Sequence, residues 1–114
     1  MKDARLTAIR AGDWVRWSIQ HAAEVILQPA NAPTLKGRSA LLAWGQSFPP
    51  IDSLVLSDIQ VWGDGKLAYA TSAYALKLKD LPLDRGKELL VFRRSARQPW
   101  EVVALSLSSD LPLQ

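Results

Sequence analysis

Residues 67–112 read LAYATSAYALKLKDLPLDRGKELLVFRRSARQPWEVVALSLSSDLP, and this stretch decides the fold. Three segments in it are rich in Val, Leu, Tyr, Phe and Trp and are bounded by Gly, Pro and Asp: Leu67–Lys79, Lys87–Arg94 and Trp100–Ser108. Such composition and boundaries predict strands. An earlier run, Leu54–Trp62, ends at Gly63-Asp64-Gly65, which supplies the positive φ values of a tight reversal. We therefore expect four long strands, each antiparallel to the next.

Both faces of this predicted sheet are apolar. Strand side chains alternate between the faces, which gives each strand two rows. The last strand places Trp100, Val102 and Ala104 on one face and Val103, Leu105 and Leu107 on the other. A sheet that is apolar on both sides needs two covers. Helices from the N-terminal half can supply one cover, and we infer a partner subunit as the other. Which row faces inward stays open.

The N-terminal half predicts helices and a short strand pair. We expect a helix over Lys2–Gln20, broken near Gly12-Asp13, where Asp13 is a good N-cap. Trp14, Trp17 and His21 then share one helix face that points at the sheet. Glu24–Gln28 reads as a short strand, onto which Thr34–Lys36 pairs back, and Arg38–Phe48 as a further helix that Pro49-Pro50 ends.

Composition places the chain among ordinary globular domains. It has 114 residues, 48% of them hydrophobic and 22% charged, which fits one domain over 1–114. It has no cysteine, so we expect no disulfide. It has no long apolar stretch and its N-terminus is polar, so we expect no membrane span and, by default, a cytoplasmic location. The net charge of +3 is scattered, and its densest group, Arg93, Arg94 and Arg97, lies at a predicted hairpin. We therefore expect a solvated hairpin and no nucleic-acid partner.

Several stretches together resemble the nuclear transport factor 2 superfamily, and more narrowly its SnoaL-like branch, over nearly the whole chain. These stretches are Ala11-Gly12-Asp13-Trp14, Gln28-Pro29-Ala30-Asn31-Ala32-Pro33 with Gly37-Arg38, Leu67-Ala68-Tyr69 with Tyr74, Asp84-Arg85-Gly86-Lys87 with Phe92-Arg93-Arg94, Trp100, and Ser109-Asp110-Leu111-Pro112. The resemblance implies an α+β cone: a curved antiparallel sheet, made of four long strands and a short N-terminal pair, wrapped around the N-terminal helices. It also implies an apolar pocket and a homodimer that packs through the outer sheet face.

Three departures from the resemblance bear on activity. Gln28-Pro29 stands where the isomerases of the superfamily have a base, and Leu105, Leu107 and Ser108 stand where relatives carry polar residues in the last strand. The helix before Gly12-Asp13 is also shorter than is usual there. The resemblance therefore does not imply an isomerase with the usual residues, and whether the protein is an enzyme stays open.

The candidate site residues form two groups. His21, Glu24 and Asp58 are the candidate acids or bases, each with a plainer reading as a packing, strand-end or surface residue. The candidate pocket residues are Trp17, Trp44, Phe48, Tyr74, Leu105 and Leu107, which serve equally as core. With a single histidine and no cysteine, we expect no metal and no cofactor.

Three functions follow from these features. We favour a homodimer with an apolar pocket for a small hydrophobic ligand and without a recognisable catalytic set. The first alternative is an isomerase, cyclase or hydratase that uses His21, Glu24 or Asp58 as acid or base. The second is a module whose sheet face or short helix docks to another protein.

Overall fold

The computed structural model describes residues 4–95 and 99–110. Its helices and strands follow one another as α1 (Ala4–Ala11), α2 (Trp14–Ser18), β1 (His21–Gln28), β2 (Leu35–Lys36), α3 (Arg38–Gln46), β3 (Ile51–Gly63), β4 (Leu67–Leu78), β5 (Asp84–Arg93) and β6 (Glu101–Ser109). Predicted features at Lys2, Arg97 and Leu111-Pro112 lie outside the described residues. Within them, no helix has the length and hydrophobicity that crossing a bilayer requires.

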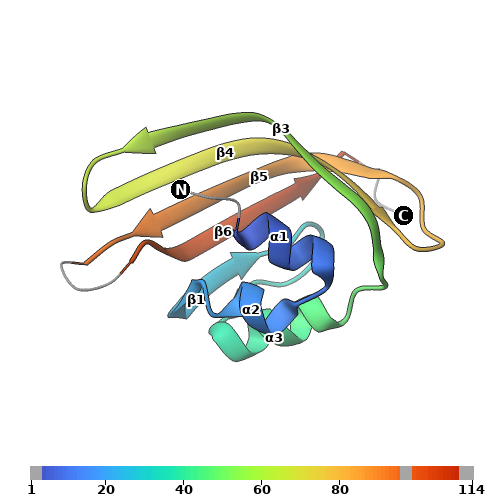
Figure 1. The fold of residues 1–114 in the computed structure, drawn as a ribbon, viewed down its shortest axis with the longest axis horizontal. Coiled ribbons are helices and arrows are strands. Elements are labelled where there is room, and N and C mark those ends of the chain that lie inside the picture. Colours follow the sequence, from blue (N-terminus) through green and yellow to red (C-terminus); the bar gives the residue numbers. More distant parts are fainter. Residues whose placement is uncertain (1–3, 96–98, 111–114) are drawn as a thin grey trace.

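The strands of the described chain form one curved sheet in the spatial order β2-β1-β6-β5-β4-β3, and the helices lie on its concave side (Figure 1). Strands β3 to β6 are consecutive antiparallel neighbours, and β1 pairs antiparallel with β2. The predicted α+β cone is confirmed. One junction differs from an all-antiparallel sheet, because β1 runs parallel to β6. The sheet stays open, with β2 and β3 at its edges.

Within the described residues the first helical segment is confirmed, but it ends earlier than the sequence predicts. Its break lies at Gly12, whose φ of 69° is in the left-handed region that glycine tolerates. Asp13 caps α2 by accepting a hydrogen bond from the backbone N–H of Arg16 at 3.1 Å. Helix α2 ends at Ser18 and β1 already begins at His21, since the carbonyl of Gln20 accepts from the N–H of Val102 in β6.

The inward row of β4 is Ala68, Ala70, Ser72, Tyr74, Leu76 and Leu78, and this settles which row faces the helices. Ala68 and Ala70 lie opposite the core residues Phe92 and Leu90 of β5, and both alanines pack against the buried core. In β6 the row prediction was wrong at Val102. A β-bulge skips Val103, so Val102 faces the core together with Leu105 although their numbers differ in parity.

The buried core occupies only the part of the sheet that the helices cover. It consists of Ala8, Trp17, Val25, Leu27, Leu41, Leu90, Phe92, Val102 and Leu105.

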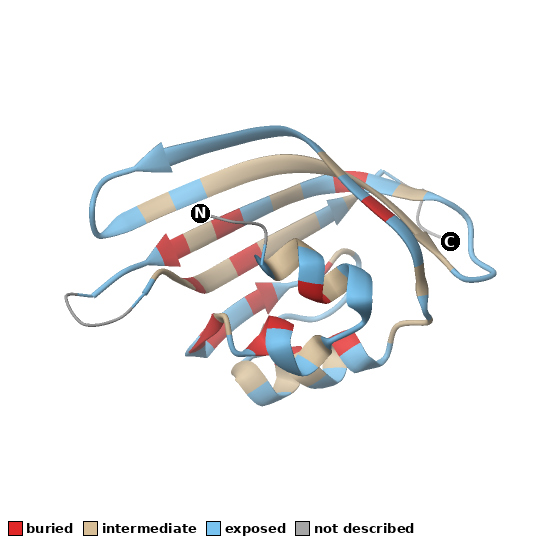
Figure 2. Cartoon of the chain, in the orientation of Figure 1, coloured by how far each residue is buried: buried red, intermediate tan, exposed pale blue. Residues whose placement is uncertain are grey.

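Two arginines connect helices to strands through hydrogen bonds. Arg10 of α1 donates to the Leu54 carbonyl at 2.7 and 3.0 Å, and Arg38 of α3 donates to the His21 carbonyl at 2.6 and 3.2 Å. The helices do not cover the whole sheet: β3 is exposed along its final half (Figure 2).

Candidate ligand-binding cavity

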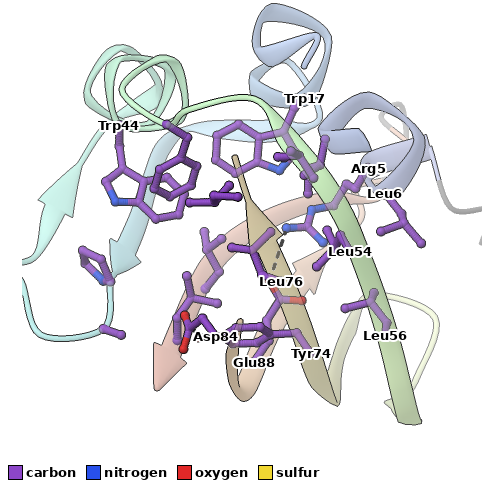
Figure 3. Close-up of a pocket in the computed structure, with 18 of the residues that line it drawn as sticks. Arg5, Leu6, Trp17, Trp44, Leu54, Leu56, Tyr74, Leu76, Asp84 and Glu88 are labelled. Carbon is purple, nitrogen blue, oxygen red and sulfur yellow. Dashed lines mark hydrogen bonds and ion pairs between the residues drawn. The ribbon is translucent and has the colours of Figure 1, made fainter. Parts of the chain in front are cut away.

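A cavity of about 370 Å³ lies between the helices and the inner face of the sheet. All the predicted pocket residues are on its lining: Trp17, Trp44, Phe48, Tyr74, Leu105 and Leu107. Further lining residues come from α1, from the Pro29–Ala32 segment and from β3. The cavity therefore occupies the interior of the cone, and Figure 3 shows its wall in close-up.

An aromatic cluster from α2 and α3 and the turn after it forms one wall of the cavity. Trp17 packs edge-on against Trp14 at 5.2 Å between ring centroids and lies 6.0 Å from Trp44. Phe48 meets Trp44 at 4.6 Å and Trp14 at 5.7 Å, both edge to face. Such contacts hold large flat side chains in fixed orientations. Gly45 lets this cluster form, because a Cβ at that position would lie 2.5 Å from the Trp14 ring.

The opposite wall is made by leucines of the inner strand rows. Leu54 and Leu56 of β3 pair with Leu76 and Tyr74 of β4, and all of them line the cavity. Leu107 of β6 continues this wall. An aliphatic and aromatic lining of this kind favours an apolar guest.

A charged pair interrupts the apolar lining. Arg5 extends from α1 into the cavity and meets Glu88 of β5, with a nitrogen-to-oxygen distance of 3.6 Å (Figure 3). Their side chains are only 15% and 12% exposed. Burial lowers the pKa of the Arg5 guanidinium, and the neighbouring Glu88 carboxylate acts in the opposite direction. Each charge depends on the other in this position, because a lone buried charge is costly.

A second set of polar side chains, Tyr74, Asp84 and Ser109, is joined by hydrogen bonds next to the apolar lining. The Tyr74 hydroxyl donates to Asp84 at 3.2 Å, and the Ser109 hydroxyl donates to the other oxygen of that carboxylate at 2.6 Å. Burial and the Asp84 carboxylate raise the pKa of Tyr74 above its usual value, so the phenol stays protonated. Gly86 leaves room for this phenol, since a Cβ there would lie 2.6 Å from the Tyr74 oxygen and would overlap the Ser108 carbonyl.

Two N–H donors in the wall have no hydrogen-bond acceptor among residues 4–95 and 99–110: Arg5 Nε and Trp17 Nε1. Both atoms are shielded from solvent. Buried N–H groups are almost always paired in folded proteins, so each such donor requires an explanation.

His21, predicted at a helix end facing the sheet, is the first residue of β1 and is fully buried outside the cavity lining. Its Nδ1 lies 2.9 Å from the Trp17 carbonyl, and its ring packs on the Trp17 indole at 4.8 Å. Burial first, and then the positive charge of Arg5, lower the pKa of His21 to about 3. The imidazole is therefore neutral near pH 7, and its role is to pack against the buried Trp17 indole.

The two candidate carboxylates lie on the surface and not on the cavity lining. Glu24 is exposed and accepts from Arg93 at 2.6 Å, an interaction that lowers the pKa of its carboxyl. It does not orient His21. Asp58 has a φ of 52° at a bulge in β3 and accepts from the Gln60 amide at 3.3 Å. The structure thus brings the candidate pocket residues together and leaves the candidate acids and bases apart.

Sequence reasoning missed Arg5, Asp84 and Glu88, the acidic and basic side chains of the lining. A signal for Glu88 was present, because it shares strand parity with Leu90 and Phe92 and so had to lie in an apolar inward row. Arg5 had no comparable signal on a short helix. In the described part of the chain, no three acidic or histidine side chains gather to bind a metal ion.

Comparison of the sequence with protein-family models and with curated proteins gives no match. Solved structures do match the fold. An NTF2-like protein of unknown function from Pseudomonas putida has a TM-score of 0.83 and 21% identity, covering 98% of this chain and 83% of its own. An NTF2-like protein from Cytophaga hutchinsonii has a TM-score of 0.80 and 16% identity, covering 94% and 90%.

A ketosteroid isomerase-like protein from Erwinia carotovora atroseptica has a TM-score of 0.78 and 20% identity, covering 96% of this chain and 90% of its own. At such identities the comparison speaks for the fold and not for an activity. The curved sheet, the enclosed helices and these structural neighbours agree with the resemblance in the sequence: the chain has the NTF2-like cone fold.

Proposed function

We propose that this protein binds a small, mainly apolar molecule in the cavity of the cone and acts as a homodimer. The observation that carries the binding proposal is the lining: fixed aromatic rings on one side, leucines on the other, and few polar groups. Ligand sites are commonly apolar hollows with a small number of placed polar groups. We also propose that the protein acts in the cytoplasm.

Cavity size sets the scale of the guest. An engineered apolar cavity of about 150 Å³ holds one benzene ring. A volume of about 370 Å³ is therefore suited to a molecule of roughly two rings or an equivalent aliphatic chain. Edge-to-face aromatic contacts fix the helical wall of the cavity, so such a molecule finds that wall preformed.

The test is a titration with N-phenyl-1-naphthylamine, a neutral dye that fluoresces in apolar surroundings. We expect saturable binding by the wild type. Leu107→Trp puts a larger ring into the cavity wall and should weaken binding at least ten-fold. Leu83→Trp is the matched control, because Leu83 is exposed and is not on the lining. Equal binding by both variants would refute the cavity as the site.

The dimer proposal rests on the outer face of the sheet. That face carries large apolar side chains between 41 and 56% exposed: Val55, Trp62, Leu67, Tyr69 and Leu89. Trp62 and Tyr69 stack there at 5.1 Å. An apolar surface on one continuous sheet face is typical of a subunit interface.

Sedimentation equilibrium tests this assembly. We expect a wild-type dimer and a monomer for Tyr69→Lys/Leu89→Lys, which places two charges on the face. Ile19→Lys changes an exposed apolar residue at the C-cap of α2 and should leave the dimer intact. A monomeric wild type would contradict the proposal and would favour a module that docks to another protein.

An enzyme of the isomerase, cyclase or hydratase type is the second candidate. The observation in its favour is that Glu88 and Asp84 lie on the lining, together with the likeness to a ketosteroid isomerase-like protein. We rank it lower because both carboxylates are occupied: Glu88 faces Arg5, and Asp84 accepts from Tyr74 and Ser109. A base must be able to take a proton from the substrate.

A further inference from the structure

The polar atoms of the cavity wall differ in whether a guest can reach them. Arg5 Nε and Trp17 Nε1 are shielded from solvent, so a molecule in the cavity does not contact them. Tyr74 and Asp84 are instead partly exposed, and both lie on the lining. Asp84 shares the inward face with Tyr74, because it pairs with Leu76 of the same row. Polar contact with a guest is therefore available on the sheet side of the cavity (Figure 3).

Tyr74 and Asp84 offer acceptors that lie close together. The Tyr74 oxygen and the nearer carboxylate oxygen of Asp84 are 3.2 Å apart. The phenol has one proton to donate, and its oxygen also accepts hydrogen bonds. A carboxylate has about four acceptor positions, and the Tyr74 and Ser109 hydroxyls donate to only one position on each oxygen of Asp84. One nitrogen of a guest can therefore lie within hydrogen-bond distance of both side chains.

Charge decides what kind of donor suits these acceptors. The described lining holds one basic side chain, Arg5, and two acidic ones, Asp84 and Glu88. Arg5 pairs with Glu88, and no ion pair among the described residues includes Asp84. The two donors to Asp84 are neutral hydroxyls, which leave the charge of the carboxylate unbalanced. A cationic donor balances that charge and forms the stronger, charge-assisted hydrogen bond.

The carboxylate of Asp84 is held from both neighbouring strands. Asp84 begins β5, while Tyr74 belongs to β4 and Ser109 to β6. Their hydroxyls donate to its two oxygens at 3.2 and 2.6 Å. A charge fixed in this way loses little conformational freedom when a ligand binds. The same two donors make Asp84 a poor base, but they leave it able to pair with a cation.

We propose that Asp84 and Tyr74 form the polar subsite of this cavity, and that its ligand is an apolar amine that binds as the ammonium ion. The ammonium group donates to the Asp84 carboxylate and to the Tyr74 oxygen. The apolar part of the ligand lies against the leucines and aromatic rings of the lining. This inference rests on the proposed binding function and adds the ligand class to it.

Three probes with the same carbon skeleton test the ligand class. (R)-1-(2-Naphthyl)ethylamine is an ammonium ion at pH 7.5, as aliphatic amines are. (R)-1-(2-Naphthyl)ethanol carries a neutral hydroxyl donor in the same place, and 2-acetylnaphthalene carries a carbonyl that only accepts. Isothermal titration at pH 7.5 should give the amine at least about ten-fold higher affinity than the alcohol, because its hydrogen bonds are charge-assisted. The ketone should bind no more tightly than the alcohol.

Asp84→Asn keeps the size of the side chain and removes its charge. The affinity for the amine should fall at least about ten-fold, and the affinities for the alcohol and the ketone by less than about three-fold. Asp110→Asn is the matched control. Asp110 is exposed and not on the lining, yet its charge is near enough to act on Tyr74. An equal loss of amine affinity in both variants would trace the preference to general negative charge and would overturn the subsite.

A nuclear Overhauser measurement on the wild-type protein needs no variant, so it remains informative if Asp84→Asn does not fold. In the complex with the amine, the proton on the carbon that bears the ammonium group should contact the ring protons of Tyr74. The naphthalene protons should contact leucine methyl groups of the lining, such as those of Leu107. An ammonium end that lies away from Tyr74 would overturn the subsite.

The outcomes distinguish this inference from the function on which it rests. An amine that binds no more tightly than the alcohol would overturn the amine ligand class and leave cavity binding intact. An amine preference that survives Asp84→Asn unchanged would overturn the assignment to Asp84. Binding of none of the three probes would overturn both the subsite and the proposed function.

Discussion

Lowering the pH from 7.5 to 5.0 should destabilise this protein because of His21. Its folded-state pKa is about 3, against an ordinary value of 6.5. The unfolded chain therefore binds a proton between these values and the folded chain does not. Stability is then fully present above pH 6.5 and is lost as the pH falls toward 3.

The expected size follows from this shift. Each pH unit inside the window changes the free energy of unfolding by about 1.4 kcal/mol per group. Between pH 7.5 and pH 5.0, about 1.5 units lie below the unfolded-state pKa of 6.5. The free energy of unfolding should therefore fall by about 2 kcal/mol. His21 is the only histidine, so no other imidazole shares this window.

Urea unfolding followed by tryptophan fluorescence at pH 7.5, 6.5, 5.5 and 5.0 measures this loss. The control is His21→Gln, which is expected to be less stable at every pH and to show no comparable loss over the same range. A wild-type unfolding free energy that stays constant between pH 7.5 and 5.0 would refute a buried, neutral His21. A His21→Gln variant that loses stability as steeply as the wild type would refute the assignment to this residue.

Further substitutions test individual contacts, each by thermal or urea unfolding. Gly86→Ala should cost at least about 2 kcal/mol, because the added Cβ overlaps the Ser108 carbonyl; wild-type stability would contradict this packing. Arg5→Met should cost about 3–5 kcal/mol by leaving Glu88 buried and unpaired, and Arg5→Met/Glu88→Met should recover most of it; no recovery would refute the pairing. Asp13→Ala should cost about 1 kcal/mol through loss of the cap of α2, and no loss would show that the cap is dispensable.

The fold could be predicted because its main signals are local. Long runs of strand-forming residues end at Gly63-Asp64-Gly65 and at the turn over residues 79–83, and the hairpins they define match β3 to β6. The break at Gly12 and the cap at Asp13 are equally local. The parallel pairing of β1 with β6 joins segments far apart in the chain, so no local sequence signal predicts it.

The bulges limited the assignment of faces. Alternation counts residues from one end of a strand, and an extra residue at Val103 reverses the count, which is why Val102 was grouped with Ala104 and not with Leu105. The apolar pocket residues were predictable because aromatics spaced along two helices must meet inside a cone. The burial of Arg5 depends on where α1 packs against the sheet, and no sequence pattern predicts that position.

The most direct test of ligand binding inside the cone is a nuclear Overhauser measurement on the protein saturated with 2-acetylnaphthalene and carrying labelled leucine methyl groups. The binding proposal predicts contacts from the probe to the inward leucines, among them Leu56, Leu76 and Leu107. Leu67 and Leu89 on the outer face should give none. Contacts to the outer leucines alone, or to none at all, would contradict a ligand site inside the cone.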